Sequence, residues 1–249
     1  MSGTLYLIPN TLGPADTTLA DPLTHLIPEQ VRRITSSLTY YVAENAKTAR
    51  AHLKLVAQTH PLAVPLQEIA IAELNVNTPA QALQALLDPI IAGRDGGLIS
   101  EAGVPAVADP GADLVRLAHR HGVTVRPLVG PSSLLLAVMG SGLNGQSFAF
   151  NGYLPQDAQE RGKRIKALEA RSRQEKQTQL FIETPYRNSA MLAALCEHCA
   201  QGTMVCVATD LTLSSEAIVT RSAGDWKKLI AANKGPDFHK KPTVFLLLG

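Results

Sequence analysis

Short apolar runs alternate with helical patterns along this chain, and each run ends in a loop rich in Gly, Pro, Asn or Ser. Such alternation predicts parallel strands joined by crossover helices, which cover both faces of a sheet. Beyond Gly130 the strand candidates follow one another more closely, so a mixed sheet is expected there. The sequence therefore predicts two α/β domains: residues 1–130 with a mainly parallel sheet, and residues 131–249 with a mixed sheet.

Turn and cap residues divide the first half into elements. Thr78 is expected to cap a helix that begins at Pro79, because proline is favoured at the first helical position. Gly122 is expected to end a second helix that begins near Gly111. The strands predicted in this half are residues 4–10, 37–45, 96–100 and 123–130.

Composition and the missing motifs exclude several classes of protein. The net charge is +2, so a surface for nucleic acid would have to be a local patch. No G-x-x-x-x-G-K-[ST] phosphate loop is present, and no G-x-G-x-x-G follows the first strand. The G-x-S-x-G and H-E-x-x-H motifs are also absent. We therefore expect neither a P-loop enzyme, a Rossmann dehydrogenase, a nucleophile-elbow hydrolase nor a zincin.

The cysteines bear on both metal binding and compartment. Cys196 and Cys199 form a C-x-x-C, but it lies in a helical pattern and no second pair of ligands accompanies it. We expect no metal site there. The odd number of cysteines, with no signal peptide and no long apolar span, predicts a cytoplasmic protein that does not associate with membranes.

The stretch GGLISEAGVPAVADPGADLV, residues 96–115, begins as a buried strand and continues into a long, rigid loop. Gly103 and Gly111 allow main-chain groups to approach a ligand closely, and Pro105 and Pro110 stiffen the loop. Such a loop suits recognition of a ligand by main-chain atoms. The alternative is a strand-to-helix connection whose Gly and Pro residues only form turns.

The chain resembles a known family through this region. LISEAGVPAVADPGADLVRLAHRHGVTVRPLVGPSSLLLAVMGSGL is similar to the central signature of the tetrapyrrole methylase superfamily. Within that superfamily it resembles the branch that methylates the 2′-hydroxyl of a cytidine in small-subunit ribosomal RNA. The similarity continues in order through GTLYLIPNTLG, FNGYLP, LFIETPYRN and VATDLT, and so covers most of the chain.

The resemblance implies two α/β domains, a cleft between them that binds S-adenosylmethionine, and a homodimer. The RNA branch further implies a small-ribosomal-subunit substrate. Carried over position by position, the cofactor contacts implied are Pro9, Asn10, Gly103, Val104, Val107, Ser132, Ser133, Ile182, Ala208 and Thr243.

Three features depart from the RNA branch. Asn45 stands where a carboxylate is expected, and KKPTV before the last strand lacks the expected glutamate. The chain also ends at Gly249 without the short C-terminal extension of that branch. Two alternatives therefore stay open beside ribose methylation: C-methylation of a tetrapyrrole precursor, and a module that binds S-adenosylmethionine without catalysis.

Methyl transfer from a sulfonium is an in-line displacement, so alignment and exclusion of water matter most. A ribose hydroxyl is a weak nucleophile, which a nearby base or cation would assist. Glu183, Lys47 and Arg187 are the predicted catalytic residues, and Glu44, Tyr186 and Asp210 also follow strand candidates. The structural alternative for each is a helix cap or a surface ion pair.

The stretch 159–176 is predicted to be a basic helix. A basic helix attracts phosphates and makes binding dependent on salt, and here the resemblance favours RNA. The alternative is a solvated helix with internal ion pairs, such as Lys166 with Glu169. Aromatic residues are few, so base stacking is not expected to stand out. The predicted RNA contacts are Arg161, Lys163, Arg164 and Lys166.

Overall fold

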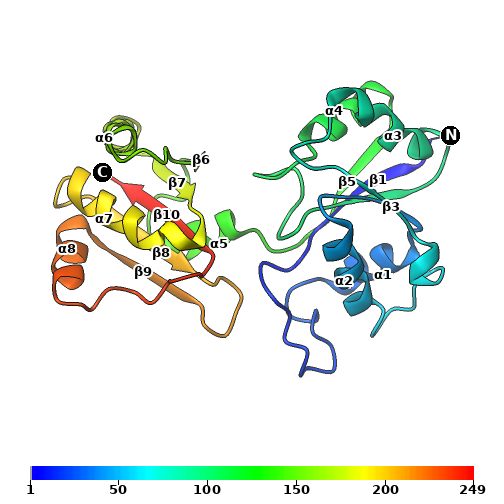
Figure 1. The fold of residues 1–249 in the computed structure, drawn as a ribbon, viewed down its shortest axis with the longest axis horizontal. Coiled ribbons are helices and arrows are strands. Elements are labelled where there is room, and N and C mark those ends of the chain that lie inside the picture. Colours follow the sequence, from blue (N-terminus) through cyan, green and yellow to red (C-terminus); the bar gives the residue numbers. More distant parts are fainter. Residues whose placement is uncertain (1) are drawn as a thin grey trace. The chain divides into compact units, whose positions relative to one another are not determined.

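The computed structural model describes residues 2–249 and divides into two compact units. The first unit is Met1–Ser132 and the second is Ser133–Gly249. Figure 1 draws the first in blue to green and the second in green to red, and each has its own sheet. The expected fold class, two α/β domains, is confirmed.

The first unit contains a five-stranded sheet in the order β3-β2-β4-β1-β5, with every pair of neighbours parallel. Crossover helices cover both of its faces. Helices α3 and α4 pack over Leu5, Val42 and Leu98, whereas α2 packs over Ile8, Tyr41 and Ile99. The strands are β1 (Thr4–Ile8), β2 (Tyr40–Ala43), β3 (Ala70–Glu73), β4 (Gly96–Ile99) and β5 (Thr124–Pro127), and the helices are α1 (Glu29–Ser37), α2 (Ala46–Val56), α3 (Leu83–Ile91) and α4 (Ala112–Arg120).

This strand order creates a switch point between β1 and β4. From β1 the chain moves past β4 to form β2, whereas from β4 it moves past β1 to form β5. The loops that follow these two neighbouring strands therefore leave in opposite directions. In open α/β sheets ligands bind beyond the carboxyl ends of the strands at such a point.

The second unit contains a mixed sheet in the order β6-β7-β10-β8-β9. β6 and β7 are parallel, and the remaining neighbours are antiparallel. The strands are β6 (Phe148–Tyr153), β7 (Thr178–Ile182), β8 (Met204–Thr209), β9 (Ala217–Ser222) and β10 (Thr243–Leu248), and the helices are α5 (Ser133–Ser141), α6 (Ala158–Glu175), α7 (Asn188–His198) and α8 (Ala223–Ala231).

An apolar core fixes the second sheet against α6, α7 and α8. The rings of Phe181 and Phe245 stack with their centroids 6.0 Å apart. Trp226 is 2% exposed, and its indole N–H donates to the carbonyl of Val205 at 2.9 Å. Because these groups are buried and satisfied, the sheet is a stable base for the loops at its edges.

The expected start of the helix after Thr78 was wrong. Thr78 does not cap a helix: its hydroxyl accepts a hydrogen bond from the amide of Asn75 at 3.0 Å, and α3 begins only at Leu83. In the alternative reading of α6, Lys166 paired with Glu169; in the described part of the helix Glu169 is buried and pairs instead with Arg173 at 2.9 Å.

Two results concern membranes and metals. Among residues 2–249, no helix is long and apolar enough to cross a membrane. The same residues contain no group of three or more His, Cys, Asp or Glu side chains arranged to hold a metal ion.

Burial raises the pKa of Cys199 to about 12 and also raises the pKa of Cys196. Both thiols therefore disfavour the reactive thiolate form.

Candidate functional site

The loops after β1 and β4 are joined by their backbones at the switch point. The amide of Asn10 donates to the carbonyl of Gly103 at 2.8 Å, and the amide of Gly103 donates to the carbonyl of Thr11 at 3.3 Å. These bonds connect segments 93 residues apart in the chain, in the position where β1 and β4 run side by side. The predicted ligand loop is therefore held by the first loop of the chain.

The side chain of Asn10 completes this connection. It is 4% exposed, and its Nδ2 donates to the carbonyls of Ser100 and Glu101 at 3.2 and 3.0 Å. Its Oδ1 accepts from the amide of Thr11 at 2.8 Å. Because an amide offers both donors and an acceptor, Asn10 satisfies three main-chain groups at once.

Two glycines are required where the loops approach one another. Gly103 has φ +68°, and a Cβ there would lie 3.1 Å from Leu12 Cδ2. A Cβ on Gly130 would lie 2.1 Å from Pro9 Cβ, so the loop after β5 packs directly on the loop after β1. Only glycine permits both conformations without displacing a neighbour.

The central loop holds strained backbone as well. Ala106 and Ala108 have φ of 64° and 66°, a region that residues with a Cβ rarely adopt. Strain of this kind persists only where the surroundings enforce it, and it clusters at ligand sites. Of the predicted cofactor contacts here, Pro9 is buried, Val104 and Ser132 are half-buried, and Val107 is 47% exposed.

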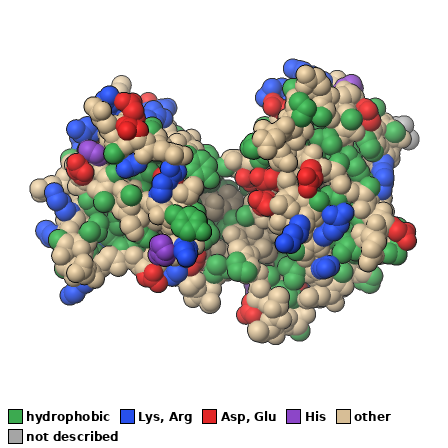
Figure 2. Space-filling model, viewed as in Figure 1, with side chains coloured by type: hydrophobic (Ala, Val, Ile, Leu, Met, Phe, Trp, Pro, Cys, Tyr) green, Lys and Arg blue, Asp and Glu red, His purple; other side chains and the backbone are tan. Residues whose placement is uncertain are grey.

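Carboxylates gather at the same edge of the first sheet. Glu44 Oε2 accepts from the amide of Glu101 at 3.1 Å, and Thr48 Oγ1 donates to Glu101 Oε1 at 3.2 Å. Burial, together with the negative charge of Glu44, raises the pKa of Asp109 to about 6. Figure 2 shows red side chains gathered on one part of the first unit.

A buried hydroxyl lies beside these carboxylates. Ser100 is 4% exposed, and its Oγ makes no hydrogen bond of good geometry to a described residue, although its contact with the Asp109 carboxyl opposes the rise in the pKa of Asp109. Buried polar groups are almost always paired, so an unpaired one at a sheet edge is a ligand candidate. Ser100, Glu101 and Asp109 were not predicted as candidate site residues, although they lie inside the glycine- and proline-rich loop of residues 100–111.

A pocket of about 420 Å³ borders the central loop in the first unit. One wall is the segment 74–83 after β3, and the other is formed by Ala108, Asp109 and Gly111 with the start of α4. Its polar groups include Asn75, Thr78 and Asp109. The pocket therefore extends the candidate site towards β3.

In the second unit, three predicted cofactor contacts lie side by side. Ile182 ends β7 opposite Val244, and Val244 also pairs with Ala208 on β8. Thr243, one residue before Val244, is 5% exposed, and its hydroxyl donates to the carbonyl of Lys241. The structure therefore brings Ile182, Ala208 and Thr243 to one edge of the mixed sheet.

The other predicted cofactor contact of the second unit is Ser133, which is the first residue of α5 and is half-buried.

Two predicted catalytic residues form an ion pair in the second unit. The side chain of Glu183 is 1% exposed, and its Oε1 accepts from Arg187 Nε at 3.0 Å, Arg187 Nη2 at 2.6 Å and the amide of Thr184 at 2.7 Å. The pair holds the guanidinium in one orientation. Lys47 belongs to the first unit, is exposed and is the second residue of α2.

Asn45 has a structural role at the start of α2. Its Oδ1 accepts from the amides of Lys47 and Thr48 at 2.9 and 3.3 Å, so Asn45 is the helix N-cap. Asparagine and aspartate are comparably good N-caps. The departure from the expected carboxylate therefore preserves the local fold.

The predicted RNA contacts lie on the first turns of α6. Arg161 Nη1 donates to the carbonyl of Gln156 at 2.9 Å, and Arg164 Nη2 donates to Asn151 Oδ1 at 3.2 Å. Lys163 pairs with Glu160 at 2.8 Å. In the described chain no ion pair involves Arg161, Arg164 or Lys166, so their charges are free to meet anions.

Comparisons with known proteins show what this chain is similar to as a whole. No protein-family model matches the chain. It is 32% identical over 187 residues to ribosomal RNA small subunit methyltransferase I of Vibrio cholerae, covering 72% of this chain but only 62% of that protein. It is 28% identical to the protein of the same name from Escherichia coli O157:H7, covering 99% of this chain and 77% of that protein.

Solved structures share the fold at lower identity. The methyltransferase CobJ matches with a TM-score of 0.61 and 17% identity, covering 100% of this chain and 95% of that one. Uroporphyrin-III C-methyltransferase of Thermus thermophilus, complexed with S-adenosyl homocysteine, matches with a TM-score of 0.57 and 16% identity, covering 99% and 97%. The chain is therefore similar in sequence to the ribosomal RNA small subunit methyltransferase I proteins, although it spans less than two thirds of the Vibrio cholerae protein, and it shares the fold of the tetrapyrrole methyltransferases.

Proposed function

We propose that this chain is an S-adenosylmethionine-dependent methyltransferase that methylates a ribose 2′-hydroxyl of small-subunit ribosomal RNA. The observation that carries the proposal is the connection between Asn10 and Gly103 at the β1–β4 switch point. The names of the relatives support both the methyl-transfer activity and the ribosomal acceptor.

The residues of the first unit fit the cofactor. Its sulfonium and amino groups carry positive charge and its ribose carries hydroxyls, so carboxylates and main-chain carbonyls suit it. Glu44, Glu101 and the unpartnered Ser100 hydroxyl supply such groups, and Gly103 and Val104 offer main chain beside them. When bound, the cofactor supplies an electrophilic methyl group.

The side chains of this protein would then act by alignment and by handling one proton. The 2′-hydroxyl must lose its proton as the new O–C bond forms. Glu183 can accept that proton and Arg187 keeps its carboxylate oriented, because two guanidinium nitrogens bond to one oxygen. Lys47 is proposed to lower the energy of the developing oxyanion.

The two alternatives have less support. The tetrapyrrole methyltransferases match at 16–17% identity, so they support the fold and leave the acceptor open. A module without catalysis was suggested by Asn45 and by the missing glutamate before Val244; of these two departures, Asn45 caps α2 as an aspartate would. The ribose acceptor therefore remains the better proposal.

Three further points belong to the same proposal. The substrate RNA is expected to contact Arg161, Lys163, Arg164 and Lys166. The active form is expected to be a homodimer, as the family resemblance implies. The protein is expected to work in the cytoplasm, because all three cysteines are free and thiols stay reduced in that compartment.

Transfer of labelled methyl tests the function directly. Small ribosomal subunits would be prepared from cells that lack this gene and any relative, and incubated with the protein and labelled S-adenosylmethionine. Label in the RNA, mapped by nuclease digestion to one 2′-O-methylated nucleotide, is the expected result. Cofactor binding without label in the RNA would exclude the ribosomal acceptor.

A further inference from the structure

A pocket of about 530 Å³ opens at one edge of the second sheet. It is lined by Tyr153, Leu154, Pro155, Gln156, Thr184 and Arg187. These residues follow β6 and β7, which are parallel neighbours, so both loops leave the sheet at the same edge. The volume falls within the range of about 300–1,000 Å³ typical of small-molecule sites.

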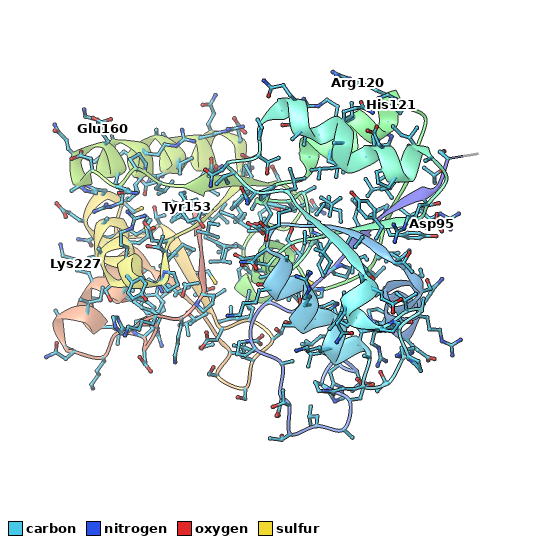
Figure 3. All side chains as sticks on the ribbon, turned by 45° about the vertical axis from the view of Figure 1, so that its right-hand side comes forward. Asp95, Arg120, His121, Tyr153, Glu160 and Lys227 are labelled. Atoms are coloured by element: carbon cyan, nitrogen blue, oxygen red, sulfur yellow. The ribbon has the colours of Figure 1, made fainter. Side chains whose placement is uncertain are left out.

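A β-bulge directs an aromatic side chain to this pocket. Phe150 pairs with Leu180, and Tyr153 pairs with Ile182. Between these two pairs β6 advances by three residues while β7 advances by two, so β6 contains one extra residue. Gly152 supplies the extra residue with φ +64°. Bulges re-aim side chains next to functional sites, and here Tyr153 is 60% exposed (Figure 3).

The chemistry of the lining suits a flat heterocycle with polar edges. Tyr153, Leu154 and Pro155 form an apolar surface, and the tyrosine offers a π-face for stacking. The amide of Gln156 and the hydroxyl of Thr184 offer donors and acceptors for a base edge. Arg187, held by Glu183, adds a fixed guanidinium.

Positive charge adjoins the pocket. Arg161 binds the carbonyl of Gln156 in the pocket wall, and Arg164 binds Asn151, whose Nδ2 donates to the carbonyl of Leu180 on β7. Neither arginine has an ion-pair partner among residues 2–249. Figure 2 shows blue side chains over the part of the surface where Figure 1 places α6. An apolar pocket rimmed by free arginines complements a base and its phosphates.

We propose that this pocket takes one unpaired nucleobase of the substrate RNA, stacked on Tyr153, while Arg161 and Arg164 contact flanking phosphates. This inference rests on the proposed RNA acceptor and names how that RNA is held. It assigns to the second unit an aromatic contact that composition alone did not suggest.

The test compares three variants in binding to a fluorescein-labelled, mixed-sequence single-stranded RNA, followed by anisotropy at several salt concentrations. Tyr153→Ala should weaken binding about 5- to 100-fold, the range for loss of one stacking partner. Tyr153→Phe keeps the ring and should stay within about twofold of the parent. Phe148→Ala is the matched control, because Phe148 is 40% exposed at the opposite end of β6.

The salt dependence separates stacking from charge. Tyr153→Ala should leave the slope of log K against log salt unchanged, whereas Arg164→Ala should reduce it by about one. Equal affinities of Tyr153→Ala and parent, in a protein that still methylates ribosomal RNA, would overturn the pocket while the proposed function stands. Failure of the parent to methylate RNA would instead overturn the function.

Discussion

The backbone amide of Asn10 donates to the carbonyl of Gly103 at 2.8 Å, and this bond joins the loops of two neighbouring parallel strands. The return bond, from Gly103 to Thr11, requires Gly103 to hold φ +68°. The loop that the sequence singles out is therefore positioned by a residue near the start of the chain. Substitution of Gly103 and substitution of Asn10 are therefore expected to have different effects, the first on cofactor binding and the second on stability.

Replacing Gly103 by alanine should weaken binding of S-adenosylmethionine. A residue with a Cβ loses about 1–2 kcal/mol in the left-handed region, and this Cβ would also press on Leu12. Gly122→Ala is the matched control, since Gly122 has φ +66° and open space around its Cβ. Calorimetry should find weaker binding only in the Gly103 variant; equal binding by both would place the cofactor elsewhere.

Asn10→Ala should lower the free energy of unfolding by about 1–3 kcal/mol, because two main-chain carbonyls and one amide lose their buried partner. Asn10→Asp should be worse, since a carboxylate cannot donate to the carbonyls of Ser100 and Glu101. Denaturant titration measures both. Asn77→Ala, at an exposed position, serves as the control; a stable Asn10→Asp variant would contradict the assigned bonds.

Asp109 should make stability fall as the pH rises from about 4 to about 6. Its pKa is raised from 3.8 to about 6 by burial and by Glu44, so the folded state binds the proton more tightly than the unfolded state in this window. The loss is complete above about pH 6. Asp109→Asn should therefore exceed the parent in stability at pH 8 and match it below pH 4.

The control for that experiment is Asp113→Asn, because Asp113 is exposed and pairs with Arg116 on the surface. Urea titrations of all three proteins at pH 4, 6 and 8 give the comparison. A constant difference between Asp109→Asn and the parent at every pH would refute the raised pKa.

Glu183→Gln should reduce methyl transfer strongly while S-adenosylmethionine binding persists, because the amide keeps an acceptor for Arg187 but cannot take a proton. Glu183→Ala should also lower stability, by about 2–3 kcal/mol. This is less than the cost of breaking a fully buried pair, because the side chain of Arg187 is 29% exposed. Single-turnover rates and thermal unfolding separate the two effects. Unchanged transfer by Glu183→Gln would leave Glu183 a purely structural residue.

Lys166→Ala should weaken binding to small ribosomal subunits and reduce the salt slope by about one, because Lys166 is exposed on α6 with no ion-pair partner in the described chain. Lys227→Ala, on α8, should change neither quantity (Figure 3). Sedimentation at several salt concentrations measures both. Equal effects of the two variants would show that only net charge matters.

Much of this fold could be predicted because its signals are local. Alternating apolar runs, Gly122 after a helix and glycines in the central loop each act through a few neighbouring residues, so they can be read from the sequence. The family resemblance in the 98–143 region added the cofactor and the class of reaction. The strands of the second unit were found for the same reason, as continuous apolar runs such as residues 243–248.

Other features were decided only by tertiary structure. The helix Ala46–Val56 follows an N-cap that was interpreted as a lost carboxylate, and Thr78 bonds to Asn75 where a cap was expected. Glu169 faces the core, although its spacing suggested a surface ion pair. In each case the partner lies within four residues along the chain, but burial and backbone geometry decided which of the possible local partners the polar group took.

The candidate site divides in the same way. The sequence by itself determined that the loop of residues 100–111 is rigid, glycine-containing and typical of a methyltransferase family. Only the tertiary structure decided that Asn10 holds it, that Ser100 lies buried beside carboxylates, and that a bulge at Gly152 exposes Tyr153. These are contacts between residues distant in sequence or shifts in strand register, and they exist only once the sheets have formed.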